Sequence, residues 1–515
     1  MICKFQSALL ITALSAALIA CDDAEQDSMV LDGQNEASMS GVSADAVTAE
    51  LDPDEVILMD NMAQPETIQD ASDADDGSEM GAVVDEFLAG IDLSNRTTIE
   101  RVVSPGGIEA WLVEESAVPV IAVEIGFAGG ARLDPPGKEG LANMLSGLLD
   151  EGAGELDSQA FQTRLEDLSI RLRFNVGLDG FYGGVRTRTE TRDEAFDLLR
   201  LALTQPRFDE EPVERIRAQL LVSLNRDKTQ PNAIARRKWF ETAFGEHPYA
   251  RPVKGTPESL TTIADLDLRA YAKSMLGQGN LKIAVVGDID AKALATLLDK
   301  TFGALIEESA PVDIQPVEVL TTGETFVVER EQPQSIVFFG GPGILIDDSD
   351  FFPAYVMNYI LGGGGFASRL TEEVREKRGL AYGVSTYFNP YEFGGIFVGT
   401  VATDNDRIAE SLGIIKSEVA RLRDEGVTEE ELVNAKTYLT GSFPLHFDSN
   451  SKIANQLVGY QLIGRGIDYI NTRNSKIEAV ISEDIARVAK RLLDPDALTV
   501  VIVGKPNGVE QTVDN

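Results

Sequence analysis

A short helical stretch has the frame of a metal-binding helix but none of its ligands. Residues 140–154 read GLANMLSGLLDEGAG, with a small-residue start, an apolar stripe and a glycine-rich exit. Histidines at positions i and i+4 of such a helix would face one side and could hold Zn²⁺. The chain has two histidines, His247 and His446, which are far apart in the sequence. No His-x-x-Glu-His or His-Glu-x-x-His pattern is therefore present, and we expect both histidines to have loop or packing roles.

A run of four glycines, Gly362–Gly365, is the second stretch of chemical interest. Glycine lets a backbone approach a bound peptide closely or lets a loop hinge, and a simple turn between helices is the competing interpretation. A nucleotide-binding loop does not fit, because the preceding AYVMNYIL has the pattern of a helix and not of a strand. The sequence also lacks G-x-S-x-G, C-x-x-C and Walker A patterns.

Length and charge restrict the class of protein. At 515 residues the chain is too long for one compact core, so at least two domains are expected. Its composition, with 43% hydrophobic and 25% charged residues, is that of a globular protein. The net charge of −39 argues against nucleic acid as a partner, since phosphate binding needs clustered Lys and Arg.

The first 21 residues resemble a bacterial lipoprotein signal. Lys4 precedes a short apolar run that ends in LIAC and is too short for a comfortable membrane span. Cleavage before Cys21 and its lipidation would anchor the protein on the periplasmic side of a bacterial membrane, and Asp22 slightly favours the inner membrane. An ordinary signal peptide with an incidental cysteine is the alternative. Since Cys3 is the other cysteine, no disulfide is expected in the folded domains.

The next segment, residues 22–92, is acidic and has no Lys or Arg. It is rich in Asp, Glu, Ser, Ala and Gly and lacks an apolar period, which predicts a disordered acidic tether and not an acidic binding motif. As a flexible chain it would span on the order of 50 Å.

The remainder has the pattern of two copies of one unit. Each copy contains an apolar strand, an aromatic-Gly-Gly before an alternating strand, a Thr/Asp-rich turn, an amphipathic helix and a final β-branched run. The matching pieces are VPVIAVEIGFAGG with QSIVFFGGPG, FYGGVRTRTETRDEAFDLL with EFGGIFVGTVATDNDRIAESL, and LKIAVVGDID with LTVVIVGKP. Strands mixed with long helices indicate α+β domains and not a βαβ array.

From about residue 99 to residue 506 the chain resembles the M16 peptidase family (pitrilysin, insulinase and mitochondrial processing peptidase). The resemblance rests on GKEGLA before the first helical stretch and on LGGGGFASRLTEEVREKRGLAYGVSTYF at residues 361–388. It implies an α+β fold of two homologous mixed α/β domains that form half of a clam-like chamber. The expected organisation is a lipoprotein signal peptide (1–21), a disordered acidic tether (22–92), an M16 N-terminal-type domain (93–306), a linker (307–325), an M16 C-terminal-type domain (326–508) and a tail (509–515).

In this family the first domain carries His-x-x-Glu-His on a helix, and a glutamate on a later helix completes the zinc site. The glutamate between the histidines acts as a general base on zinc-bound water. The resemblance places Asn143 and Gly147 at the two histidines and Ser146 at the general base. By a looser match it places Ser223 at the distal glutamate. None of these side chains can replace what is missing, so we predict a lost metal site; a helix that has always merely packed is the alternative.

This chain matches the family's C-terminal signature better than it matches the zinc signature of the first domain. Family members use an arginine and a tyrosine seven residues later to reach across the chamber toward the substrate, and here these are Arg375 and Tyr382. The arginine can hold a substrate carbonyl or carboxylate, and the tyrosine hydroxyl can stabilise an oxyanion. Outside this signature, an arginine on a charged helix is usually solvated and a tyrosine after Leu-Ala usually belongs to a core.

The resemblance favours a non-catalytic, substrate-binding subunit of a heterodimeric M16 zinc metallopeptidase. A zinc-bearing M16 homologue would bring the metal and the base, while this chain would bring Arg375, Tyr382 and Gly362–Gly365 and bind no cofactor itself. Its expected partners are that homologue, a peptide or unfolded polypeptide, and a membrane through the lipid anchor. A proteolytically inactive scaffold or interaction protein is the alternative, against which the retained Arg/Tyr pair argues. An independent enzyme of different chemistry has no supporting residues.

Overall fold

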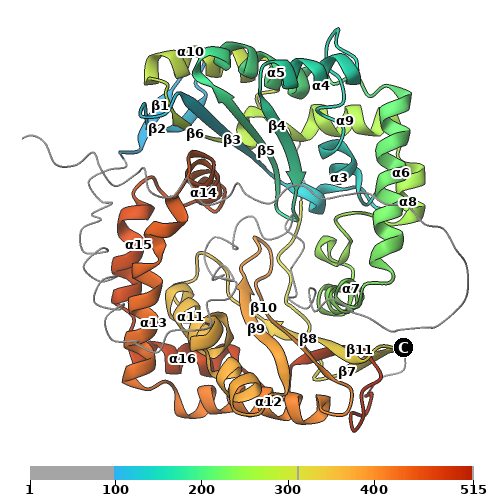
Figure 1. The fold of residues 1–515 in the computed structure, drawn as a ribbon, viewed down its shortest axis with the longest axis vertical. Helices are drawn as coiled ribbons and strands as arrows, with labels where there is room; N and C mark the ends of the chain where they lie inside the picture. Colours follow the sequence, from blue (N-terminus) through green and yellow to red (C-terminus); the bar gives the residue numbers. More distant parts are fainter. Residues whose placement is uncertain (1–97, 310–312, 513–515) are drawn as a thin grey trace, which may run out of the picture. The chain divides into compact units, whose positions relative to one another are not determined.

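The computed structural model describes residues 98–309 and 313–512 (Figure 1). The expected signal peptide, the acidic tether and Cys21 lie outside these residues. Within the described ranges, no helix combines the length and the apolar character that a membrane span requires.

The first half is built on a six-stranded sheet with the order β1-β2-β6-β3-β5-β4. β2 and β6 are parallel, and the other neighbours are antiparallel. The strands are β1 (Glu100–Val103), β2 (Glu109–Glu114), β3 (Val120–Ala128), β4 (Arg171–Val176), β5 (Gly180–Arg188) and β6 (Leu281–Gly287). The helices are α3 (Leu141–Ser146), α4 (Ser158–Asp167), α5 (Arg192–Thr204), α6 (Glu210–Asp227), α7 (Pro231–Phe244), α8 (Pro257–Thr262), α9 (Asp265–Met275) and α10 (Ala291–Phe302).

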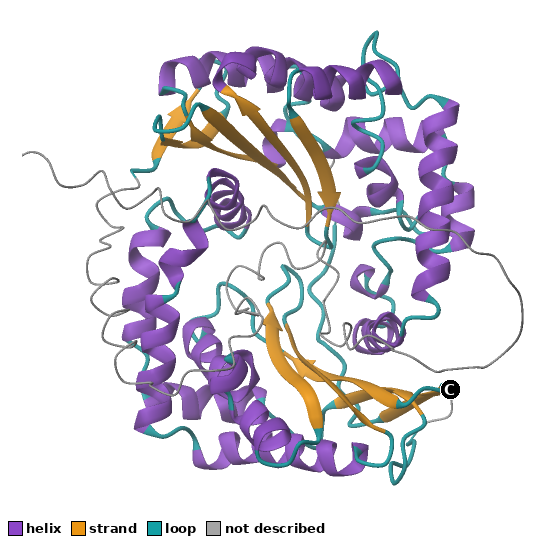
Figure 2. Cartoon of the chain, viewed as in Figure 1, coloured by secondary structure: helices purple, strands orange, loops and turns teal. Residues whose placement is uncertain are grey.

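The second half is built on a five-stranded sheet with the order β7-β11-β8-β10-β9. Its strands are β7 (Thr325–Glu329), β8 (Gln334–Pro342), β9 (Ala381–Asn389), β10 (Ile396–Asp404) and β11 (Thr499–Gly504). Its helices are α11 (Phe351–Asn358), α12 (Ile408–Glu425), α13 (Glu429–Gly441), α14 (Asn450–Leu462), α15 (Tyr469–Glu478) and α16 (Ser482–Leu492), with π-helical turns at Tyr359–Gly363 and Thr371–Glu376. Figure 2 shows both sheets with their flanking helices.

The two halves repeat one topology. The order β2-β6-β3-β5-β4 in the first sheet corresponds strand for strand to β7-β11-β8-β10-β9 in the second, and the parallel pair β2/β6 corresponds to β7/β11. The predicted α+β fold with two homologous halves is therefore confirmed. The first half adds one edge strand, β1, which pairs with β2.

One detail of the predicted repeat is wrong. The aromatic-Gly-Gly of the first copy does not precede a strand, because Gly183 and Gly184 lie inside β5. Gly394 and Gly395 of the second copy do precede their strand, β10. The difference has a packing cause: a Cβ on Gly183 would lie 2.8 Å from the ring of Phe174 on β4, so glycine is required within the strand.

One helix of each half packs on the sheet of the other half. α7, from the first half, packs on β8 and β11, and α14, from the second half, packs on β3 and β6 (Figure 1). The strands divide their side chains accordingly. In β11, Val500 and Ile502 join the core of the second half, whereas Val501 and Val503 join the cluster around α7. Each sheet is therefore covered on one face by helices of its own half and on the other face by a helix of the other half.

Trp239 is the main anchor of α7 on the second sheet. Its side chain is fully buried, its ring centroid lies 5.6 Å from that of Phe338, and its Nε1 donates to the carbonyl of Thr499 at 3.2 Å. A Cβ on Gly340 would lie 3.0 Å from the Trp239 ring, so glycine on β8 makes room for the indole. The Trp239 side chain therefore fixes the distance between α7 and the sheet of the second half.

We expect Trp239→Ala to lower the free energy of unfolding by about 3–5 kcal/mol, the usual range for removing a buried aromatic side chain. Trp239→Phe, which keeps most of the ring volume, should cost less. Both halves should lose stability, because α7 joins them. Urea unfolding followed by circular dichroism would measure this, and a second half that unfolds at the wild-type midpoint in Trp239→Ala would contradict it.

Candidate functional site

Helix α3, where the sequence predicts a lost metal site, is held at its amino end by a buried carboxylate. Asp134 accepts hydrogen bonds from the backbone N–H groups of Gly140 and Ala142, at 2.8 and 2.9 Å. Gly140 adopts a φ of 90°, which is a left-handed conformation that glycine tolerates. Burial raises the pKa of Asp134 to about 7, although the backbone N–H groups favour its charged form. The frame of the helix is therefore intact without a metal.

The positions expected for zinc ligands carry none, and of the three at this helix Ser146 is buried while Asn143 and Gly147 are half-buried. Ser146 is buried and its hydroxyl donates to the carbonyl oxygen of Asn143 at 2.8 Å, so it is engaged within the helix. A Cβ on Gly147 would lie 3.3 Å from Cγ2 of Ile216 on α6, so the isoleucine fills the space next to the glycine. Ser223 lies on α6 too, two turns or about 10 Å beyond Ile216.

No metal-ligand cluster is found elsewhere in residues 98–309 and 313–512: no group of three or more His, Cys, Asp or Glu side chains could hold an ion. His247 instead caps a short turn, because its Nδ1 accepts from the backbone N–H of Tyr249 at 3.2 Å and its Nε2 lies 3.1 Å from the carbonyl oxygen of Gln315. Burial lowers the pKa of His247, which fits a neutral ring. His446 lies in the 3₁₀ turn Phe443–Phe447.

Arg375 and Tyr382, which the resemblance selects as the functional pair, lie next to each other. The Cζ of Arg375 is 5.0 Å from the ring centroid of Tyr382 and 4.5 Å from that of Phe366. Tyr382 is 64% exposed and Phe366 is 70% exposed, so the stack faces solvent. The sequence patterns did not single out Phe366, although a large aromatic residue directly after four glycines was a usable signal. Such cation–π contacts hold the guanidinium in place. Its Nε also lies 3.3 Å from Oε1 of Glu376, with which it forms an ion pair.

A β-bulge turns Tyr382 outward. In the pairing of β9 with β10, Val384 is opposite Val401 and Ala381 is opposite Thr403. The two residues between them on β9, Tyr382 and Gly383, are therefore opposite a single residue of β10. A bulge of this kind bends the strand and re-aims the side chain that follows it. Because β9 is the edge strand of its sheet, the bulge places the tyrosine at an open rim.

The glycines beside this stack are required by close packing. A Cβ on Gly362 would lie 2.5 Å from the hydroxyl oxygen of Thr386 on β9, and one on Gly363 would lie 2.6 Å from Nδ2 of Asn358. A Cβ on Gly364 would lie 2.7 Å from the carbonyl oxygen of Tyr359. Gly365 has a φ of 55°. The run of glycines thus lets the π-helical turn lie directly on β9.

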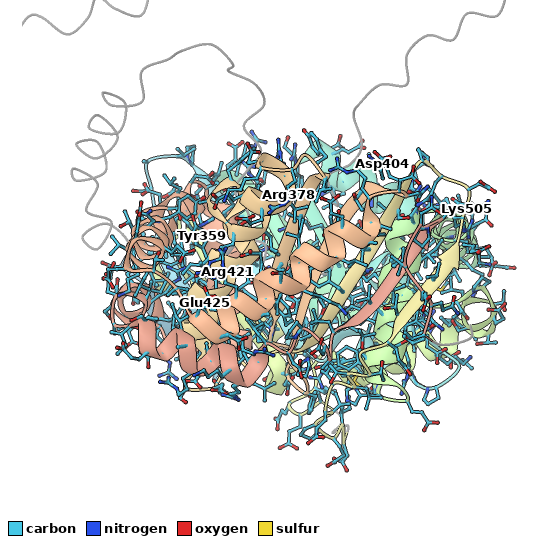
Figure 3. The ribbon with its side chains drawn as sticks, turned by 90° about the horizontal axis from the view of Figure 1, so that it is seen from below. Tyr359, Arg378, Asp404, Arg421, Glu425 and Lys505 are labelled. Carbon is cyan, nitrogen blue, oxygen red and sulfur yellow. The ribbon has the colours of Figure 1, made fainter. Side chains whose placement is uncertain are left out.

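The segment that carries Arg375 is fixed by buried ion pairs. Arg369, with only 6% of its side chain exposed, donates to both carboxylate oxygens of Glu431 on α13, at 2.6 and 2.8 Å. Burial acts to raise the pKa of Glu431, but the hydrogen bonds from Arg369 and Thr428 lower it to about 2. Figure 3 labels Arg378, which donates to Glu373 in the same segment. These contacts hold the signature against α13 in one position.

Comparison with known proteins gives the family. The sequence profile described as "Insulinase (Peptidase family M16)" matches residues 111–257, and the profile described as "Peptidase M16 inactive domain" matches residues 264–439. The chain belongs to peptidase family M16. It is an M16 member of the inactive type, since the helix that carries the family's zinc ligands has none of them.

Relatives of this M16 chain include proteins with similar descriptions. It is 26% identical over 391 residues to "Non-peptidase homolog YmxG" of Helicobacter pylori, covering 76% of this chain and 90% of that protein. It is 24% identical over 414 residues to "Uncharacterized zinc protease YmxG" of Bacillus subtilis, covering 80% of this chain and 99% of that protein. A solved peptidase M16 inactive domain from Pseudomonas fluorescens matches with a TM-score of 0.75 and 26% identity, over 81% of this chain and 100% of that one.

The ion pair of this M16 signature should make stability depend on pH in acid. Because folding depresses the pKa of Glu431 to about 2, its contribution is complete above its unfolded-state pKa of about 4.5 and is lost as the pH falls through 2. Glu431→Gln should therefore lower the melting temperature at neutral pH and differ less from wild type near pH 3. Thermal unfolding across this range is the measurement. A variant that differs from wild type by the same amount at both pH values would contradict the role of the charge.

Proposed function

We propose that this chain is the non-catalytic, substrate-binding subunit of a heterodimeric M16 zinc metallopeptidase. The observation that carries the proposal is the contrast between two sites of one chain. The metal-binding positions of α3 carry no side chain that can hold zinc, whereas Arg375 and Tyr382 are adjacent, with Tyr382 exposed and Arg375 half-buried against its ring. A chain that served only as a scaffold has no need to keep an arginine and a tyrosine presented in this way.

The residues of this chain suit the second half of an amide-hydrolysis site. The guanidinium of Arg375, fixed between two rings, can donate to a carbonyl or carboxylate of a bound peptide. The hydroxyl of Tyr382 makes no hydrogen bond within the described residues and can donate to an oxyanion. The zinc of the partner would supply the activated water, and no residue of α3 fits that metal.

Removal of the Tyr382 hydroxyl tests the proposal. Tyr382→Phe keeps the ring that stacks on Arg375, so the complex with a zinc-bearing M16 partner should still assemble. The kcat/KM of the complex should fall by roughly 10²–10³, the scale for one oxyanion donor. Tyr438→Phe, at a half-exposed tyrosine on α13, is the matched control and should retain wild-type activity. Peptide hydrolysis is measured with gel filtration to confirm assembly, and full activity in the assembled Tyr382→Phe complex would favour the scaffold alternative.

We further propose that the protein is lipid-anchored through Cys21 on the periplasmic side of a bacterial membrane, on the strength of the signal-like sequence that ends there. Cys21→Ser should move the protein from the membrane to the soluble fraction, because a lipid chain would supply its membrane affinity. The circular dichroism spectrum should not change, since the substitution lies outside the folded halves. Unchanged membrane association in cell fractionation would contradict the anchor.

A further inference from the structure

Four exposed arginines gather on one face of the first sheet. Arg171 and Arg173 lie on the edge strand β4, and Arg186 and Arg188 lie on the neighbouring strand β5. Side chains alternate along a strand, and Val185, directly before Arg186, points into the helix-covered core. The four arginines therefore point to the other face, the one on which α14 packs. In a chain with a net charge of −39, this stripe is a local inversion of charge.

Two of these arginines have carboxylate partners. Nη2 of Arg173 lies 2.7 Å from Oε1 of the buried Glu124 on β3. The pair crosses β5 above Gly184, where a Cβ would lie 2.6 Å from the glutamate, so the glycine makes room for the ion pair. Arg188 pairs with Glu190 at 2.5 Å. The structure thus neutralises one arginine on each strand, Arg173 on β4 and Arg188 on β5.

The other two arginines, Arg171 and Arg186, make no ion pair with any carboxylate of the described residues. They are directly opposite each other in the β4–β5 register, where two like charges destabilise a sheet. No packing gain offsets this arrangement, because both side chains are exposed. A local rule that is broken without structural compensation is expected at positions kept for binding or catalysis.

A cavity of about 310 Å³ opens beside Arg186. The residues around it include Glu115, Val118, Val120, Arg186, Ser449 and Asn450. The wall combines apolar side chains with one cation, Arg186, and one carboxylate, Glu115. An aliphatic side chain would match the apolar part of this wall, and a carboxylate beside it would match Arg186.

We propose that this face binds an acidic segment of a polypeptide substrate, with Arg171 and Arg186 as its specificity-determining residues. The inference rests on the proposed function only in taking the bound polypeptide to be a substrate. A guanidinium matches a carboxylate through two parallel hydrogen bonds, and two unpaired guanidinium groups side by side can hold two carboxylates of one strand. Peptide is favoured over nucleic acid because the negative charge of the remaining chain repels a long polyanion.

Binding of a labelled peptide to the purified full chain tests the proposal. The probe is a fluorescein-labelled peptide of alternating glutamate and alanine, compared with one of alternating lysine and alanine, in fluorescence anisotropy at low salt. The acidic peptide should bind through Arg171 and Arg186, whereas any binding of the basic peptide to this acidic chain should not depend on these two residues. Arg171→Gln combined with Arg186→Gln should raise the Kd of the acidic peptide about tenfold or more, because two charge-assisted anchors are removed.

The matched control removes two charges elsewhere. Arg164 on α4 and Arg226 on α6 are exposed and have no carboxylate partner within the described residues, and their joint change to Gln should alter the Kd less than about twofold. An equal loss in both double variants would reduce the effect to net charge and overturn the proposal. Tight binding of a single-stranded oligonucleotide that the Arg171/Arg186 variant abolishes would replace the peptide by a nucleic acid.

Thermal unfolding separates binding from structure. Loss of the repulsion between Arg171 and Arg186 should leave the melting temperature unchanged or raise it, whereas a fall would assign the pair a structural role and overturn the proposal. The assay needs no zinc-bearing partner. Its failure therefore leaves the function proposed above to be judged separately by Tyr382→Phe.

Discussion

The exchange of α7 and α14 between the two halves is the contact on which the rest of the structure depends. A sheet whose strands are apolar on both faces needs cover on both, and the helices of each half cover only one face of its own sheet. The second face of each sheet is closed by a helix of the other half, with Trp239 on one side and Leu457 and Val458 of α14 on the other. The same arrangement exposes the β4–β5 side of the first sheet, because α14 packs on β3 and β6 and leaves the arginine stripe open.

The two halves differ in what they present to solvent. In the first half, the helix that carries zinc ligands in active M16 members is joined to its neighbours by packing, with Ile216 against Gly147. In the second half, Arg369 is buried against Glu431, while Tyr382 is exposed and Arg375 lies half-buried beside it. Buried ion pairs add little net stability compared with apolar contacts, but they fix one geometry. In the second half, the Arg369–Glu431 pair therefore fixes the position of the segment that presents Arg375 and Tyr382.

The sequence is enough to predict the duplicated α+β fold and the missing zinc ligands, because both follow from local patterns and motif spacing. It does not predict which sheet α7 and α14 cover, since an amphipathic helix shows that it has an apolar face and not where that face packs. The juxtaposition of Arg171 and Arg186 depends on the register of a hairpin, which composition does not reveal. Phe366 likewise joins Arg375 only through the turn that the glycines permit.

The persistence of α3 without its ligands has a physical reason. Met144 and Leu145, beside the vacated ligand positions, are fully buried in the main core of the first half. Loss of such a helix would remove several apolar side chains from the core, at a cost of about 2–5 kcal/mol for each large one. The carboxylate of Asp134 accepts hydrogen bonds from the backbone N–H groups at the amino end of the helix. The packing of α3 is thus independent of the residue types at positions 143 and 147: the fold fixes the buried face of the helix, and these two positions carry no metal ligand.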